Sequence, residues 1–264
     1  NLKLYYFYIH DYLFKSLDKI FLKKNNYYLK SENSEKNNII ASHSQDFSNI
    51  LSYNIQDRVN SKKFIVYLDT GGPFFTGDAL LNNLKLPENN NELFYKNLNS
   101  FFDYLEKIFK KRVIIVPHSK FKNPSLKDKN YIHYFNNRRS INDYDALPKL
   151  VNKTFFFISR GSTAISYGIV KSIPIQIIYS SSYNYLHNEK NDLKLQSKTL
   201  GTKLIDIDKY SEKKLRKNLK VNIDKFKRYK LDFLSSIKNE KPNYQIINKF
   251  FLKYSNEKKN KKTN

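Results

Sequence analysis

The chain has 264 residues, with 48 lysines and arginines against 24 aspartates and glutamates, which gives a formal net charge of +24 at pH 7. It contains no cysteine, which excludes disulfide bonds and thiolate-bound metal and fits a reducing compartment, so the cytoplasm is the default location. No run is long and apolar enough to cross a bilayer, and no leader of the signal-peptide type is visible. Because the chain begins with Asn1 and has no methionine, we expect it to start inside a longer protein.

The positive charge indicates a nucleic acid or an anionic membrane surface as the class of partner. The lysines are nevertheless spread along every segment, and the chain is rich in Lys, Asn, Ile, Tyr and Phe, as expected from an AT-rich genome. A generally basic, solvated surface is therefore the alternative to a dedicated binding stripe.

The first strands are predicted after an amino-terminal segment of helical and then polar character (1–38). Residues 39–41 form a short strand candidate, and the β-branched and aromatic run 64–68 predicts a buried strand. This strand ends at Asp69, directly before a Gly-Gly-Pro loop. A carboxylate in this position lies where open α/β sheets bind ligands.

The middle of the chain continues the alternation of helices and strands. Residues 92–111 carry apolar side chains at helical spacing and predict an amphipathic helix, and 113–116 predict the next strand, which leads into His118 and Lys120. Two shorter elements are expected before the next strand, namely a strand over 131–135 and a helix over 143–151.

The stretch 155–179 predicts a strand, a tight turn, a helix and a second strand, which together form a phosphate-binding βαβ unit. Gly161 permits the turn, and Ser162 and Thr163 begin the helix. The amides and the dipole at a helix N-terminus attract an anion, so we expect a phosphorylated ligand here. Plain helix capping by the serine is the alternative.

The remaining elements complete the prediction of an α/β, Rossmann-like, doubly wound parallel sheet. They are a loop and helix over 181–200, a last strand over 203–207, helices over 221–237 and 244–254, and a disordered basic tail after Tyr254.

Polar side chains follow three of the predicted strands: Asp69 the first, His118 the second, and Ser162 with Thr163 the third. They converge on one crevice if the strands are neighbours. Asp69 is either a general base or a residue that stabilises the glycine turn, and His118 either binds an anion or is packed. Asp46 is the next candidate base.

Seven segments occur in a characteristic order: HSQDF (43–47), FIVYLDTGGPF (64–74), NLNSFFDYLEKIF (97–109), VIIVPHSK (113–120), YFNNR (134–138), SRGSTAISYGIV (159–170) and VNIDKFKRYKLDFL (221–234). Together they resemble bacterial surface-polysaccharide biosynthesis glycosyltransferases. The resemblance implies a GT-B fold, in which the carboxyl-terminal Rossmann-like domain holds the donor and the amino-terminal domain is truncated. The domains expected are 1–60 as a remnant of the acceptor domain, 61–220 as the nucleotide-sugar domain, 221–254 as terminal helices and 255–264 as the tail.

The chain is also distantly similar to bacterial sialyltransferases of GT-B type, through Asp69 with Gly71, through His118, and through Ser162 with Thr163. This likeness implies that Asp69 is the general base and that His118 supports the donor phosphate, which the two hydroxyls bind. No metal is implied, and a CMP-linked sugar is one candidate donor. We expect Lys120, Arg160 and Gly161 to complete the phosphate site. The chain departs from that pattern because the Asp69 motif lacks a second acid, Ser119 follows His118 instead of proline, and Arg160 stands where many relatives have histidine.

The two resemblances imply a metal-independent bacterial glycosyltransferase for capsule or lipopolysaccharide. We expect it in the cytoplasm, with peripheral contact to the inner face of the membrane. Its partners are a nucleotide-sugar and a saccharide or lipid-linked acceptor, and no nucleic acid is expected. The alternatives are a GT-B-type sugar-nucleotide epimerase, a non-catalytic basic nucleic-acid-binding protein, and an inactive fragment, because half a GT-B crevice cannot position an acceptor.

Overall fold

The computed structural model describes residues 42–53, 62–71, 91–118, 131–141, 143, 145–183, 189–235 and 241–260. All of them belong to one compact unit that begins at Ser42. The predicted helical segment 1–38 and the strand candidate 39–41 lie outside the described residues.

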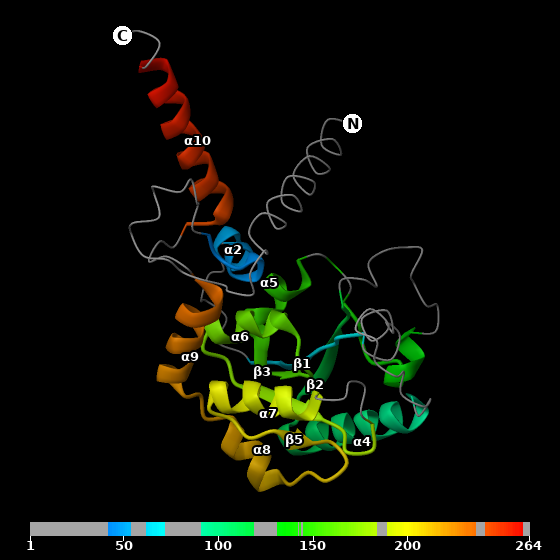
Figure 1. The fold of residues 1–264 in the computed structure, drawn as a ribbon. Helices are drawn as coiled ribbons and strands as arrows, with labels where there is room; N and C mark the ends of the chain where they lie inside the picture. The colour runs from blue at the N-terminus through cyan, green and yellow to red at the C-terminus, as the bar shows by residue number, and fades with distance from the viewer. Residues whose placement is uncertain are drawn as a thin grey trace, which may run out of the picture. The chain divides into compact units, whose positions relative to one another are not determined.

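A parallel sheet forms the centre of this unit (Figure 1). Its five strands run in the order β2-β1-β3-β4-β5. Every pairing between neighbours is parallel. The strands are β1 (Phe64–Leu68), β2 (Arg112–Val116), β3 (Thr154–Ser159), β4 (Ile175–Tyr179) and β5 (Ile205–Asp206). The α/β class and the parallel, doubly wound sheet are therefore confirmed.

Helices cover both faces of the sheet, because side chains along each strand alternate between them. Ile65 and Tyr67 of β1 pack with α4 (Asn91–Phe109) and α8 (Glu212–Asn218) on one face. Val66 and Leu68 face the other side, which is covered by α2 (Gln45–Ser52), α5 (Ala146–Leu150), α6 (Ser166–Val170), α7 (Glu189–Leu200) and α9 (Ile223–Tyr229). Figure 1 shows α4 and α8 on the side of the sheet opposite to α5 and α6.

Two features explain why these elements pack closely. Helix α4 buries an apolar stripe at helical spacing that includes Leu98, Phe102 and Leu105, as its periodicity predicts. Helix α6 approaches the sheet at Gly168, where a Cβ atom would lie 2.9 Å from a ring carbon of Phe157. This close contact fixes the position of α6 behind β3 and β4.

The prediction of a strand over residues 131–135 is wrong, because Tyr131–Phe135 is the 3₁₀ helix η5. The aromatic content that suggested a strand serves the core instead, since the ring of Phe135 is fully buried against Tyr67 and Tyr95. The chain reaches the edge of β2 a few residues later, where Ser140 forms a parallel bridge to Ile115.

The carboxyl-terminal elements confirm two predicted helical regions with altered boundaries. Helix α9 continues as a π-helical turn, η8 (Lys230–Leu234), and α10 extends over Asn243–Asn260, into the segment for which we expected disorder. Asn243 joins α10 to the amino-terminal part of the unit, because it accepts a hydrogen bond from the His43 amide at 2.8 Å and donates one to the His43 carbonyl at 2.9 Å. This contact involves only the first residue of α10, and Phe251 and Leu252 further along the helix are 60% and 65% exposed, so the expected packing of the last helix on the amino-terminal region stays a prediction. None of the helices described is both long and apolar enough to cross a membrane.

Candidate functional site

The order of the strands reverses between β1 and β3, since β2 lies on one side of this pair and β4 and β5 lie on the other. Open α/β sheets bind ligands outside the carboxyl ends of the strands at such a point. Leu68 and Ser159 are paired in the last register position of β1 and β3. The structure therefore brings Asp69 and the Arg160–Thr163 loop to neighbouring strand ends. His118 follows β2, on the other side of β1.

Asp69 is buried, with 5% of its surface exposed, and its amide donates to the carbonyl of Val116 at 3.0 Å. Its carboxylate accepts a hydrogen bond from the hydroxyl of Tyr67. Burial raises the pKa of the Tyr67 phenol well above its ordinary value, and the charge of Asp69 adds to this effect, while Arg160 opposes it. The carboxylate is thus oriented by a phenol beneath the strand end, a partner that the sequence does not indicate.

Arg160 is held by protein groups in this structure. Only 2% of its side chain is exposed, and its guanidinium lies 2.6 Å from a carboxylate oxygen of Glu189. The rings of Phe94 and Tyr183 lie at 4.8 and 5.0 Å from the guanidinium carbon. Cation–π contacts and a carboxylate together compensate the loss of water around a buried charge. The guanidinium is therefore turned toward Glu189 and away from solvent, and its predicted contact with a phosphate stays a prediction.

The loop Gly161–Thr163 has the features of a tight turn before a helix. Gly161 adopts a φ of +90°, which is strained for other residues. The Ser162 amide donates to Ser159 Oγ at 2.9 Å, and Ser162 Oγ accepts from the Ala164 amide at 3.3 Å, as a helix cap does. Within the part of the chain that the structure describes, the amides of Gly161 and Thr163 are not used by the loop. The serine therefore caps the short helical segment, and two amides of the turn are available to an anion.

Asp46 approaches the same loop from the opposite face of the sheet. It lies in the first turn of α2, which packs against α6. Burial raises its pKa above the ordinary value, and the hydroxyls of Thr163 and Ser166 act in the opposite direction. Two carboxylates thus flank the β3 loop, Asp69 from the α4 side and Asp46 from the α6 side. The sequence could not show this, because Asp46 and Thr163 are far apart in the chain.

A second polar cluster lies at the ends of β4 and β5. Asp208 accepts hydrogen bonds from the Ser182 amide at 2.7 Å, from Ser180 Oγ at 2.9 Å and from Asn97 Nδ2 at 2.9 Å. Burial raises the pKa of Asp208, but these hydrogen bonds outweigh burial and hold the pKa below its usual value. Its carboxylate is therefore an ionised hydrogen-bond acceptor beside the predicted crevice, and most of the hydrogen bonds that it can accept already come from the protein itself.

The other expected site residues are only partly defined. His118 is partly buried, and Lys120 lies outside the described residues. Among the residues that the structure describes, no group of three or more His, Cys, Asp or Glu side chains is placed to hold a metal ion.

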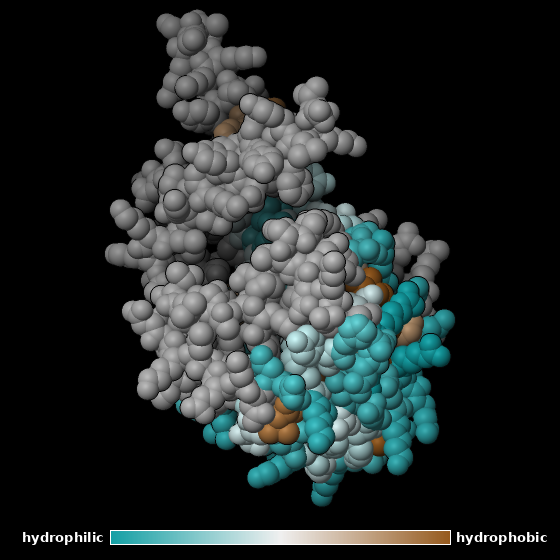
Figure 2. All heavy atoms as spheres, turned by 90° about the vertical axis from the view of Figure 1, so that its right-hand side faces the viewer, coloured by the Kyte–Doolittle hydropathy of each residue, from teal (hydrophilic) through white to brown (hydrophobic). Residues whose placement is uncertain are grey.

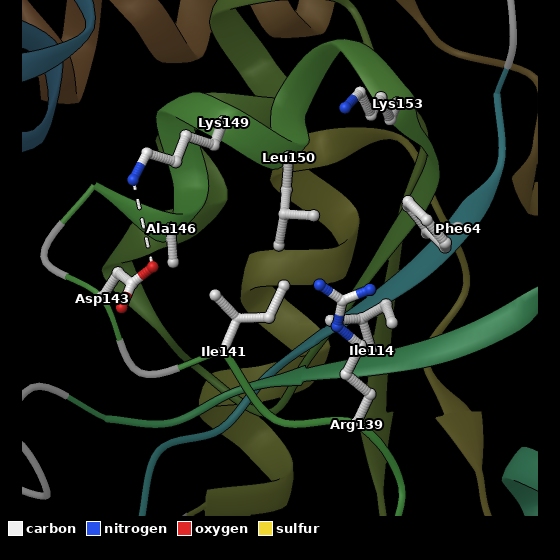
Figure 3. A pocket seen from close by; sticks show the side chains of 9 residues that line it. All are labelled: Phe64, Ile114, Arg139, Ile141, Asp143, Ala146, Lys149, Leu150 and Lys153. Atoms are coloured by element: carbon white, nitrogen blue, oxygen red, sulfur yellow. Dashed lines mark ion pairs between the residues drawn. The ribbon is translucent and has the colours of Figure 1, made fainter.

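A cavity of about 240 Å³ lies away from these strand ends (Figure 3). It is bounded by the first residue of β1, the residue that precedes β3, and helix α5, so it lies toward the amino end of the sheet. Its lining residues are Phe64, Ile114, Arg139, Ile141, Asp143, Ala146, Lys149, Leu150 and Lys153, which we call the α5 pocket.

Comparisons with known proteins do not show a family for this chain. No protein-family profile matches it, and no curated protein matches it significantly. Among solved structures, a variant of the wall teichoic acid polymerase TagF aligns with a TM-score of 0.35 and 15% sequence identity. The alignment covers 76% of this chain and 46% of the TagF chain, so the chain spans less than half of that structure.

Proposed function

We propose that this chain is the donor-binding part of a glycosyltransferase that transfers a sugar from a nucleotide-sugar to a cell-surface saccharide or a lipid-linked acceptor. The observation that carries the proposal is the position of Asp69 and the Gly161–Thr163 loop at neighbouring strand ends, where the strand order reverses. A carboxylate beside an anion-binding turn provides the two functions that this reaction needs.

In the proposed reaction, the acceptor hydroxyl attacks the anomeric carbon while the bond between that carbon and the nucleotide phosphate breaks. The departing phosphate gains negative charge, which the free amides of the turn stabilise together with His118 and Lys120. Asp69 takes the proton of the acceptor hydroxyl. The proposal includes no metal, because the family resemblance implies none, and it places the reaction in the cytoplasm.

A thermal-shift screen of the full-length protein against CMP-, UDP- and GDP-linked sugars tests donor binding. A ligand that binds the folded state raises its melting temperature, and the nucleotide that does so identifies the donor class. If none of these donors shifts the melting temperature at saturating concentration, the proposed function is wrong.

Ser162→Ala separates a phosphate ligand from a helix cap. The variant should weaken donor binding by about 1–3 kcal/mol if a hydrogen bond to a charged phosphate is lost. Ser44→Ala is the matched control, since Ser44 Oγ caps α2 through the Phe47 amide at the same distance of 3.3 Å. Equal donor affinity in both variants would reduce Ser162 to a cap.

Asp69→Asn tests the base. Donor binding should be nearly unchanged, while turnover falls by roughly two to four orders of magnitude. If turnover per folded molecule stays near normal and only the melting temperature falls, Asp69 stabilises the turn. Asp46→Asn is then the next variant to measure.

A further inference from the structure

The amino end of the sheet carries a row of cations that the proposed transfer reaction does not use. Lysine or arginine stands just before, or at the start of, the four strands β1, β2, β3 and β5. The exposed members of this row are Lys62, Lys63, Lys110, Arg112, Lys153 and Lys203, which we call the basic edge. The described segments that lead into the strands contain no aspartate or glutamate. Because parallel strands start at one edge of a sheet about 4.8 Å apart, five strands spread these charges over roughly 19 Å.

Carboxylates beside the basic edge are already engaged by other cations. Glu106 accepts from the Val113 amide at 2.7 Å and pairs with Arg138 at 3.4 Å. Asp145 pairs with Lys149 at 2.9 Å. Among the described residues, no carboxylate pairs with a cation of the basic edge, so these charges are available to an external partner. The opposite edge differs, because carboxylates such as Asp69 and Asp206 stand there.

The α5 pocket joins this edge and adds an apolar surface to it. Lys153 belongs to both, and its carbonyl accepts a hydrogen bond from the Lys63 amide at 2.8 Å. Figure 3 shows Leu150 and Ile141 directed toward each other, with Arg139 and Lys153 among the side chains that line the pocket. Lys149 is turned to Asp143, at 3.9 Å, so these two charges offset each other. Arg139 and Lys153 have no ion-pair partner among the described residues.

A row of cations beside an apolar hollow matches one class of partner better than others. A phospholipid presents anionic phosphates in a plane with acyl chains beneath them, and basic side chains near such a surface each contribute to binding. Single-stranded nucleic acid would instead require exposed aromatic rings among the cations. Among the described residues, the strongly exposed aromatic side chains are Tyr53, Phe233, Tyr244 and Phe251, and none of them belongs to the basic edge or lines the α5 pocket. The rings at the edge itself, Phe64 and Phe155, are partly buried. On the face of the molecule drawn in Figure 2, most of the described residues are hydrophilic, and apolar residues form only small, separate spots.

We propose that the basic edge and the α5 pocket form a contact surface for the headgroups of an anionic lipid bilayer. The proposal does not rest on the transferase reaction, since it concerns the opposite end of the sheet. It assigns the general membrane contact expected from the net charge to particular residues.

Cosedimentation of the full chain with vesicles tests this surface. The protein should bind vesicles that contain phosphatidylglycerol, should not bind pure phosphatidylcholine, and should be released as salt shortens the Debye length below about 8 Å. The variant Lys63→Gln, Arg139→Gln, Lys153→Gln removes three cations. Each contributes about a fivefold factor, so the partition coefficient should fall on the order of 100-fold.

The matched control is Lys96→Gln, Lys209→Gln, Lys213→Gln, which removes the same charge from exposed positions near the carboxyl end of the sheet. Its partition coefficient should stay within a fewfold of the unmodified protein. An equal loss in both triple variants would show a general effect of net charge and overturn the proposal, as would the absence of any preference for phosphatidylglycerol. Retained vesicle binding with a selective loss of RNA binding in the first variant would assign the surface to nucleic acid. All melting temperatures should be unchanged, since the six side chains are exposed.

Discussion

The buried ion pair between Arg160 and Glu189 allows a quantitative test of what Arg160 does. The side chains are only 2% and 14% exposed, so water screens the attraction weakly, and the two atoms lie 2.6 Å apart. Glu189→Gln leaves an uncompensated guanidinium between Phe94 and Tyr183. Removal of one partner of such a pair costs about 3–5 kcal/mol. For a unit of this size, that corresponds to a decrease in melting temperature of roughly 6–20 °C.

A double-mutant cycle measured by urea unfolding provides the assay. Arg160→Met with Glu189→Leu should recover most of the loss, because an apolar pair of similar volume replaces both charges. Glu212→Gln is the control, since Glu212 and Arg216 lie at the same distance of 2.6 Å but are about half exposed. This pair should contribute no more than about 0.5 kcal/mol. If Glu189→Gln costs no more than Glu212→Gln, the buried pair is dispensable and Arg160 is free to bind a phosphate.

Two further changes test the packing and the electrostatics around the β3 loop. Gly168→Ala should destabilise the protein by about 1 kcal/mol in urea unfolding, because the new methyl group would lie 2.9 Å from Phe157 and 3.1 Å from Ile175, both fully buried. The cost of this overlap outweighs the gain in helix propensity. A more stable variant would show that α6 can move away from the sheet. Asp46→Asn should become more stable relative to the unmodified protein as the pH rises from 4 to 7, since the raised pKa of Asp46 means that its ionisation above 3.8 disfavours the folded state. A melting-temperature difference that does not change with pH would contradict the raised pKa.

The fold could be predicted from the sequence because its strands are short apolar runs separated by helical periods. Runs such as Phe64–Leu68 are buried on both faces of a parallel sheet, and no other element gives this pattern so clearly. The pattern failed at Tyr131–Phe135, where aromatic residues indicate burial but not backbone conformation. Helix α2 was also missed, although Ser44 provides a cap, because the helix spans only Gln45–Ser52.

The candidate site was only partly predictable, since strand ends can be located from the sequence but their partners cannot. The positions of Asp69 and Ser162 follow from the ends of two strands and from the fact that these two strands are neighbours in the sheet. Glu189, which lies against Arg160, is separated from it by a segment with no recognisable motif. An arginine beside a glycine turn can face a ligand or a carboxylate, and contacts between residues far apart in the chain decide which. Secondary-structure propensity and hydrophobic periodicity do not describe such contacts.

The two carboxylates beside the β3 loop differ in a way that bears on which of them can act as a base. Asp69 is buried against the Tyr67 hydroxyl, whereas Asp46 is partly exposed and has a raised pKa. A base is most effective when its pKa approaches the working pH and when it can reach the acceptor. Asp46 better meets the first condition, because desolvation raises its pKa. Asp69 better meets the second condition, because it stands at a strand end, where the acceptor would bind. Because Asp46 reaches the loop through Thr163, a change at Asp46 should alter donor affinity as well as turnover, while a change at Asp69 should alter turnover alone. Under the proposed reaction, that difference, measured on one preparation, separates the role of Asp69 from that of Asp46.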